Sequence, residues 1–315
     1  MSISVLELLP RRQPEPLVCQ CLSKHAATQM QSVVKKTAAH WSRLGSVAIC
    51  LSIALLSQAQ ATVVTLPVPA QADGEVHNPG LWEEYSLYRP AHTEADGQQL
   101  PILFFLHGAG RRGTDPSQVQ SLPPLAAAAN GHEYPFIIAA PQVRPQRSTG
   151  ESRVLDELEV FMEDVIEMTN ADRSRVYIAG QSMGGRGTWD LMMRKPDYFA
   201  AGIPIAGASN TVPRAARLID VPIWAFHGRL DKVVPVERSI ELIDAIEAAG
   251  GQKAQLTIYE DGKHDVWWRT LNRNSEVYDW MLAQQNHDIP EPSSIASVAL
   301  LTGLLTYRRS GYRRS

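Results

Sequence analysis

Residues 179–187 read AGQSMGGRG, and this stretch decides how the rest of the chain is interpreted. The pentapeptide at 180–184 fits G-x-S-x-G, a pattern in which a serine stands on a sharp turn between a strand and a helix. An apolar run at 176–179 comes directly before it, and a helix-like stretch at 184–193 follows it. Glycines relieve contacts that larger side chains would make in such a turn. We therefore predict that Ser182 is a nucleophile and not one residue of a glycine-rich turn.

Apolar runs alternate with helical patterns on both sides of this turn. Uninterrupted apolar strands suit a parallel sheet that is covered on both faces. Residues 152–169 and 236–249 carry apolar side chains at helical spacing. The alternation predicts an α/β fold with a doubly wound, mostly parallel sheet and helices on both faces. The runs are LPILFFLHGAG, YPFIIAAPQ, SRVYIAGQS, YFAAGIPIAGA, VPIWAFHGRLD and QLTIYEDGKHD.

The general base is sought among the histidines, because a serine hydroxyl attacks poorly until a base removes its proton. Hydrolases of this architecture order the triad as serine, acid, histidine, which leaves His227, His264 and His287. His264 follows a predicted strand and precedes a helix-like stretch at 266–282. His227 stands in a tight His-Gly turn, where it suits orienting the loop, and His287 lies beyond the last helical pattern. We predict His264 as the base.

The acid that orients the imidazole is predicted to be Asp231, in the loop that closes the preceding strand. Asp261 and Asp265 are too close to His264 in the chain for their carboxylates to contact its imidazole easily. Asp220 precedes its strand and so lies at the wrong end of the sheet. Capping of the helix that begins near Pro235 is the alternative role for Asp231.

The oxyanion of an acyl transfer needs backbone N–H groups aimed at it. One is predicted from Met183, next to the nucleophile. The other is expected from the loop HGAGRRG at 107–113, from Ala109 or, as the alternative, from Gly110. The phosphate-loop pattern G-x-x-x-x-G-K-[ST] does not occur in this glycine-rich segment. Arg111 and Arg112 of the loop either bind an acidic substrate or are simply solvated.

The N-terminal 61 residues read as an extension and a secretory signal. Basic residues precede the apolar run LGSVAICLSIALL at 44–56, and the small-residue pattern Ala-Gln-Ala follows at 59–61. Met30 stands at a normal distance upstream and is an alternative start. Cleavage after Ala61 would remove all 3 cysteines and leave an exported domain at 62–289 without disulfides. Signal peptidase is thus an expected processing partner.

The C-terminal segment 290–315 contains Pro-Glu-Pro, an apolar stretch at 295–307 and a terminal arginine cluster. Two prolines interrupt any helix before this stretch, and the arginines would remain cytoplasmic. The segment resembles the PEP-CTERM sorting tail of certain Gram-negative bacteria. That resemblance implies transient membrane association, cleavage by an exosortase-type enzyme, and a final location in the periplasm, at the cell surface or in the extracellular matrix.

From about residue 100 to 283 the chain resembles an α/β-hydrolase of the dienelactone hydrolase and prolyl oligopeptidase-like superfamily. It is close to a group labelled phospholipase/carboxylesterase or predicted peptidase. The segments that carry the resemblance are LHGAGRRG, FIIAAPQ, SRVYIAGQSMGGRGTWD, VPIWAFHGRLDKVVP and YEDGKHDVWW. The resemblance implies Ser182, Asp231 and His264 as the triad. Relatives usually carry a tryptophan after the Pro-Gln at 141–142, whereas PQVRPQRSTGES stands here, so no substrate is carried over.

The expected function is that of an exported serine hydrolase, a carboxylesterase acting through an acyl-enzyme. The short segment at 207–221 leaves no room for a large lid, and an open site suits esters on a decorated polysaccharide. Amide hydrolysis is the alternative, and a non-catalytic surface protein is a third reading. Trp189, Trp267 and Trp268 form either a sugar-stacking platform or part of the core.

Several partner classes are not expected. The formal net charge of -3 argues against a nucleic-acid surface. No histidine pair stands at metal-ligand spacing, so neither a metal nor a cofactor is expected.

Overall fold

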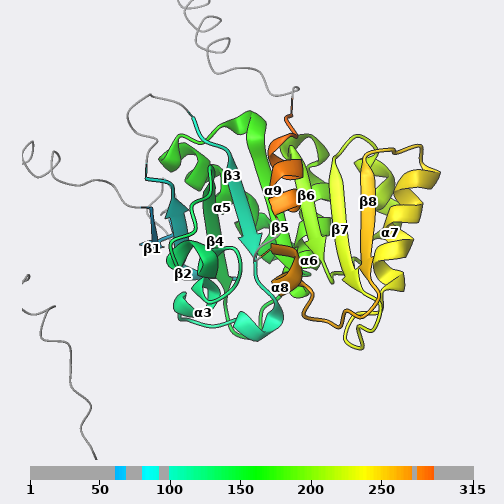
Figure 1. The fold of residues 1–315 in the computed structure, drawn as a ribbon, viewed down its shortest axis with the longest axis horizontal. Coiled ribbons are helices and arrows are strands. Elements are labelled where there is room, and N and C mark those ends of the chain that lie inside the picture. Colours follow the sequence, from blue (N-terminus) through cyan, green and yellow to red (C-terminus); the bar gives the residue numbers. More distant parts are fainter. Residues whose placement is uncertain (1–60, 69–79, 92–98, 272–274, 287–315) are drawn as a thin grey trace, which may run out of the picture. The chain divides into compact units, whose positions relative to one another are not determined.

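The computed structural model describes residues 61–68, 80–91, 99–271 and 275–286. Within this part an eight-stranded sheet has the order β1-β2-β4-β3-β5-β6-β7-β8 (Figure 1). The strands from β4 to β8 are mutually parallel, whereas β1 and β2 are antiparallel to their neighbours at one edge. The bounds are β1 Thr62–Pro67, β2 Leu81–Arg89, β3 Ile102–Leu106, β4 Ile137–Val143, β5 Val176–Gln181, β6 Ala201–Ile205, β7 Ile223–Gly228 and β8 Ala254–Tyr259.

Helices cover both faces of this sheet. The α-helices are α3 Ser117–Gln120, α4 Leu125–Ala129, α5 Ser152–Thr169, α6 Met183–Arg194, α7 Glu237–Ala248, α8 Trp267–Leu271 and α9 Ser275–Leu282. The 3₁₀ helices are η1 Ala109–Arg111, η2 Arg173–Arg175, η3 Pro196–Tyr198 and η4 Val212–Leu218. The stretch at 266–282, which reads as one helical segment in the sequence, contains both α8 and α9.

The core lies in two layers because successive side chains of a strand point to opposite faces. Ile102 and Phe104 of β3 pack with the helices α5, α6 and α7 on one face. Leu103 and Phe105 of the same strand pack with α3, α4, α8 and α9 on the other. All residues of β3, β4, β5 and β6 are buried. The predicted doubly wound α/β sheet, with helices on both faces, is therefore confirmed.

The two antiparallel strands were not anticipated from the sequence. Four of the six residues of β1 are exposed, as expected of an edge strand. β2 carries Glu83 and Glu84, which interrupt its apolar residues. These strands extend the sheet away from the edge formed by β7 and β8, so they add to the core without entering the region around Ser182.

The strand-to-helix turn at Ser182 depends on the close approach of backbone segments. Ser182 has φ 54° and ψ -115°, a conformation that side chains rarely adopt. A Cβ atom on Gly184 would lie 2.0 Å from the carbonyl oxygen of Leu106, and one on Gly180 would lie 2.4 Å from that of Gly184. The missing side chains thus let α6 begin directly against the end of β3.

Replacing Gly184 with alanine should destabilise the protein, because the added methyl group meets backbone atoms that cannot move independently. We expect Gly184→Ala to lower the free energy of unfolding by about 2–4 kcal/mol, measured by urea denaturation. Gly110 is the matched control, since a Cβ atom there meets nothing within 4 Å. Equal stability of the two variants would contradict this explanation of the turn.

Candidate active site

Three side chains from separate loops form a continuous hydrogen-bonded series at the carboxyl ends of the parallel strands. Ser182 follows β5, Asp231 follows β7 and His264 follows β8. The Nε2 atom of His264 lies 2.8 Å from Ser182 Oγ, and its Nδ1 atom lies 2.7 Å from Asp231 Oδ2. The structure thus brings together all three residues that the sequence nominated. The arrangement allows His264 to accept the serine proton while Asp231 fixes the tautomer.

Asp231 is held as a carboxylate by its hydrogen bonds. Its side chain is fully buried, which raises its pKa, but hydrogen bonds from His264 and from the backbone N–H groups of Val234 and Val233 outweigh burial and lower the pKa overall. Those N–H groups donate to Oδ1 over 2.8 Å for Val233 and 2.9 Å for Val234. The second oxygen, Oδ2, therefore remains available to His264.

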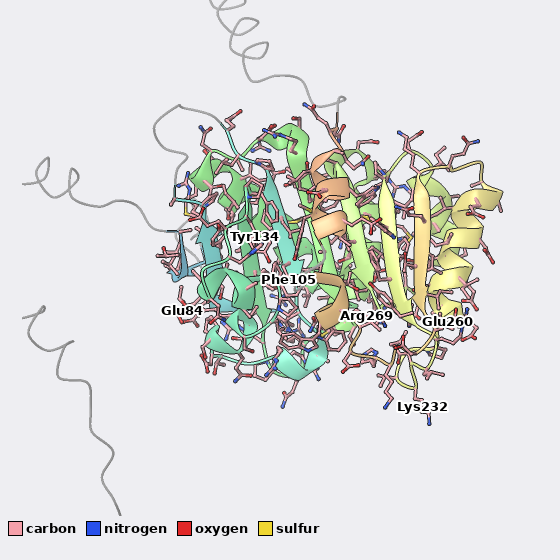
Figure 2. The ribbon with its side chains drawn as sticks, viewed as in Figure 1. Glu84, Phe105, Tyr134, Lys232, Glu260 and Arg269 are labelled. Atoms are coloured by element: carbon pink, nitrogen blue, oxygen red, sulfur yellow. The ribbon has the colours of Figure 1, made fainter. Side chains whose placement is uncertain are left out.

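His227 supports the loop that carries Asp231. Burial lowers the pKa of this imidazole, so it is neutral at pH 7. Its Nε2–H donates to the Val234 carbonyl over 2.9 Å and lies 3.2 Å from Asp231 Oδ2. Nδ1 accepts from the Ser239 hydroxyl over 2.7 Å. The loop-orienting role expected for His227 agrees with these contacts. Lys232, labelled in Figure 2, belongs to this loop. It lies at the same end of the sheet as Arg269 of α8, which is labelled as well.

His107 has a structural role that the sequence did not reveal. The backbone N–H of Val143 donates to its Nε2 over 2.9 Å, so Nδ1 carries the proton and donates to the Gly108 carbonyl over 2.7 Å. Burial lowers the pKa of His107 to about 4, and the charges of Arg112 and Arg111 act in the same direction. A neutral imidazole therefore ties the loop after β3 to the end of β4.

Among the remaining histidines of the described residues, His132 does not join this site. His132 packs edge-on against Tyr134, with ring centroids 4.5 Å apart. His77, His92 and His287 lie outside the described residues.

The predicted oxyanion-hole residues lie around Ser182. Met183 is the first residue of α6, a position whose N–H has no partner within the helix. Ala109 and Gly110 begin η1 and line a cavity together with Ser182 and His264. The carbonyl of Ala109 accepts from the side chain and the backbone N–H of Arg112, which hold the loop in place. Both Ala109 and Gly110 remain candidates for the second donor.

This cavity, termed the Ser182 cavity, has a volume of about 420 Å³. Its lining combines glycine and alanine backbone with apolar side chains and a few polar groups. The residues are Gly108, Ala109, Gly110, Arg111, Leu122, Gln181, Ser182, Val233, His264, Trp267 and Trp268. Such a mainly apolar pocket with convergent polar groups is typical of a small-molecule site.

Of the arginines and tryptophans singled out in the sequence, some line the Ser182 cavity and others have structural roles. Arg111 lines the Ser182 cavity, whereas Arg112 donates to the carbonyls of Ala109 and Arg147 and stabilises the loop. Trp189 is fully buried in the core. Trp267 and Trp268 line the cavity, and the Trp267 ring meets His264 edge-on with centroids 5.4 Å apart. A stacking role is thus open only to the latter two.

Within the part of the chain that the structure describes, no group of three or more His, Cys, Asp or Glu side chains is arranged to hold a metal ion. In the same part, no helix has the length and apolar character needed to cross a membrane.

In comparisons with known proteins, residues 138–279 match the model of the dienelactone hydrolase family. The match includes Ser182, Asp231 and His264 but begins after the loop that carries His107. A bifunctional acetylxylan esterase/xylanase of Neocallimastix patriciarum is 27% identical over 158 residues, which are 49% of this chain and 22% of that protein. The chain therefore spans less than a quarter of the length of this curated relative.

Solved structures with the same architecture include two esterases. A thermostable esterase is 30% identical, with a TM-score of 0.56, and the match covers 72% of this chain and 63% of that one. A feruloyl esterase module from Clostridium thermocellum, complexed with sinapinate, is 16% identical with a TM-score of 0.54. That match covers 74% of this chain and 90% of the module, and at this identity it shows the fold alone. The fold is that of the α/β-hydrolases.

The buried neutral state of His107 should make stability depend on pH. The folded pKa of about 4 lies below the ordinary value of 6.5, so the unfolded chain binds more protons between these values. Stability from this residue is complete above pH 6.5 and is lost as pH falls towards 4, at about 1.4 kcal/mol per pH unit. We expect His107→Gln to flatten the wild-type slope by about this amount in urea denaturation.

Other titrating groups, including His227, are common to both proteins and cancel in the difference. Parallel slopes for wild type and His107→Gln between pH 4 and 6.5 would contradict a neutral His107.

Proposed function

We propose that the protein is a serine hydrolase that cleaves carboxylic esters through an acyl-enzyme on Ser182. The observation that carries the proposal is the continuous series Ser182 Oγ, His264 and Asp231, with distances of 2.8 and 2.7 Å. The series lies at the carboxyl ends of the parallel strands, where ligands bind in open α/β sheets. The esterase names of the relatives support an ester substrate.

In the first half of the reaction, Ser182 Oγ attacks the ester carbonyl carbon while His264 Nε2 takes the hydroxyl proton. The imidazolium that forms donates through Nδ1 to the Asp231 carboxylate. The carbonyl oxygen becomes an oxyanion, which the backbone N–H of Met183 and that of Ala109 or Gly110 stabilise. Collapse of this intermediate breaks the bond to the alkoxy oxygen, which receives the proton from His264.

In the second half, a water molecule replaces the departed alcohol. His264 Nε2 takes one of its protons as the water oxygen attacks the acyl carbonyl. The same N–H groups stabilise the second oxyanion. The bond to Ser182 Oγ then breaks, the serine recovers its proton from His264, and the carboxylic acid leaves. Asp231 remains ionised throughout, in keeping with its lowered pKa.

The proposed substrates are acyl esters on polysaccharides. The support comes from relatives whose names include acetylxylan and feruloyl esterase. The connection from β6 to β7 contains only the short helix η4, whose Ala215 and Leu218 are buried in the hydrophobic core. No residue of this connection lines the Ser182 cavity, so an ester group on a long polymer can approach it.

The proposal extends to export and processing of the chain. The signal at 1–61 would be removed by signal peptidase and the tail at 290–315 by an exosortase-type enzyme, releasing the domain 62–289. Both apolar stretches lie outside the described residues, so the support is their sequence pattern.

Loss of the Ser182 hydroxyl should abolish ester hydrolysis. We expect Ser182→Ala to lower kcat/KM for para-nitrophenyl acetate by at least about 10³-fold, because no nucleophile replaces it. Ser174→Ala is the matched control, since that serine lies just before β5, at the opposite end of the strand. Retention of activity in Ser182→Ala would refute the mechanism.

The same preparations, assayed on a peptide para-nitroanilide, separate esters from amides. We expect turnover of the ester alone. Amide cleavage of equal efficiency that depends on Ser182 would make the protein a peptidase.

Processing is tested on the protein isolated from its native cell surface. Mass spectrometry of the intact protein should show an N-terminus near Thr62 and a C-terminus near Pro290. Recovery of the exported protein with Ser315 still present would contradict cleavage of the tail.

A further inference from the structure

The loop that precedes α5, at residues 147–151, contacts the segments on both sides of the nucleophile. It follows β4 in the chain and takes no part in the proposed proton transfers. Thr149 is fully buried, and its hydroxyl donates to the carbonyl of Met183, the first residue of α6. Since Met183 is predicted to supply one of the two oxyanion N–H groups, this hydrogen bond acts within the turn that carries the nucleophile.

Gly187 of α6 explains how the threonine reaches this position. A Cβ atom on Gly187 would lie 2.8 Å from Thr149 Cβ, so the missing side chain leaves room for Thr149. Gly184 and Gly185 admit the ends of β3 and β6 in the same way. The first turns of α6 are thus in close contact with three segments, and the contact with the 147–151 loop includes a side-chain hydrogen bond.

The hydrogen bond from Thr149 restrains the direction of the Met183 N–H. That N–H belongs to the peptide group between Ser182 and Met183, whose carbonyl accepts from the Arg186 N–H over 2.9 Å. The carbonyl of Met183, in the next peptide group, accepts from Thr149. Because two successive planar peptide groups share only one Cα atom, fixing both carbonyls leaves the N–H between them little freedom to rotate.

The same loop also holds the segment that carries the second predicted donor. Arg112 Nη1 donates to the Arg147 carbonyl over 3.2 Å, and Arg112 Nε donates to the Ala109 carbonyl over 3.1 Å. The guanidinium thus connects η1, where Ala109 and Gly110 lie, to the loop that holds Met183. Contact between α6 and β3 brings the two halves of the predicted oxyanion hole together, and the loop restrains each half.

Hydrogen bonds within the loop make it a firm support. The Ser148 N–H donates to the Glu151 carboxylate over 2.7 Å, and the Gly150 N–H donates to the Ser148 hydroxyl over 3.2 Å. Glu151 also pairs with Arg147 over 2.9 Å. Donors held by such a loop are in place before the reaction begins, which is what stabilisation of an oxyanion requires.

We propose that the 147–151 loop positions the oxyanion hole, with Thr149 as the positioning residue for Met183 and Arg112 as the link to the second donor. The inference rests on the proposed ester hydrolysis. Thr149 does not line the Ser182 cavity, so it acts through the backbone and not on the substrate. Its loss should therefore weaken binding of the transition state more than binding of the ester.

The test separates the Thr149 hydroxyl from its packing, in the full-length protein. Thr149→Val replaces the hydroxyl with a methyl group, whereas Thr149→Ser keeps it. Per folded protein, checked by circular dichroism, we expect Thr149→Val to lower kcat/KM for para-nitrophenyl acetate at least about tenfold. KM should stay within about twofold, because acylation and deacylation use the same donors. Thr149→Ser should retain kcat/KM to within about threefold of the wild type.

A transition-state analogue links the effect to the oxyanion. Ser182 Oγ adds to the carbonyl carbon of 1,1,1-trifluoro-2-butanone, its proton passes to His264, and the ketone oxygen becomes an oxyanion. The inhibition constant should rise in Thr149→Val by about the factor by which kcat/KM falls. A loss of stability alone would leave both quantities unchanged per folded protein.

Matched controls remove similar groups that lie outside this loop. Thr169→Val deletes a buried hydroxyl that donates to the Val165 carbonyl over 2.6 Å within α5, and it should leave kcat/KM unchanged. Arg112→Met breaks the second link and should lower kcat/KM at least about threefold. Arg173→Met removes an exposed guanidinium that pairs with Glu163, and it should have no such effect.

A Thr149→Val variant with wild-type kcat/KM would overturn the inference, as would a Thr149→Ser variant that is equally impaired. An inhibition constant that does not change while kcat/KM falls would do the same. If Thr149→Val does not fold, the comparison of Arg112→Met with Arg173→Met decides. Failure of the proposed function is a different outcome, in which the wild type does not hydrolyse the ester at all.

Discussion

The approach of the first turn of α6 to the end of β3 is the constraint on which the rest of the site depends. The backbone at Gly184 lies so close to the Leu106 carbonyl that no side chain fits between them. This approach forces Ser182 into positive φ and projects it beyond the sheet. It also brings the loop after β3 next to the serine, since a Cβ atom on Gly108 would lie 3.4 Å from Ser182 Cβ. The nucleophile and the predicted oxyanion loop are thus positioned by one contact.

Three histidines surround this turn and the fold uses them differently. His107 and His227 are buried, and burial lowers the pKa of each, so they act as neutral hydrogen-bonding groups that hold loops in place. His264 has a side chain that is 20% exposed and lies between Ser182 and a buried carboxylate. The exposure of the side chain therefore distinguishes His264, which is proposed to transfer protons, from the two buried imidazoles that support loops.

The sequence predicted the parallel part of the sheet because its strands are continuous apolar runs that end at polar loops, as at Leu106 and Gln181. It did not predict β1 and β2, because β1 is a largely exposed edge strand and β2 carries polar residues such as Glu83, so neither is a continuous apolar run. Ser182, Asp231 and His264 could be nominated because chain order and strand ends restrict the choice.

The roles of other residues depend on contacts between distant segments, which spacing alone does not encode. His107 accepts from Val143 across the ends of two strands.

The central claim is that acyl transfer passes through Ser182, and trapping the intermediate tests it most directly. The wild-type protein is mixed with para-nitrophenyl acetate, quenched in acid during turnover and digested for mass spectrometry. We expect one acetyl group on the peptide that contains Ser182, and none after the same treatment of Ser182→Ala. Acetylation of a different residue that accounts for turnover, or hydrolysis without any acyl adduct, would contradict the claim.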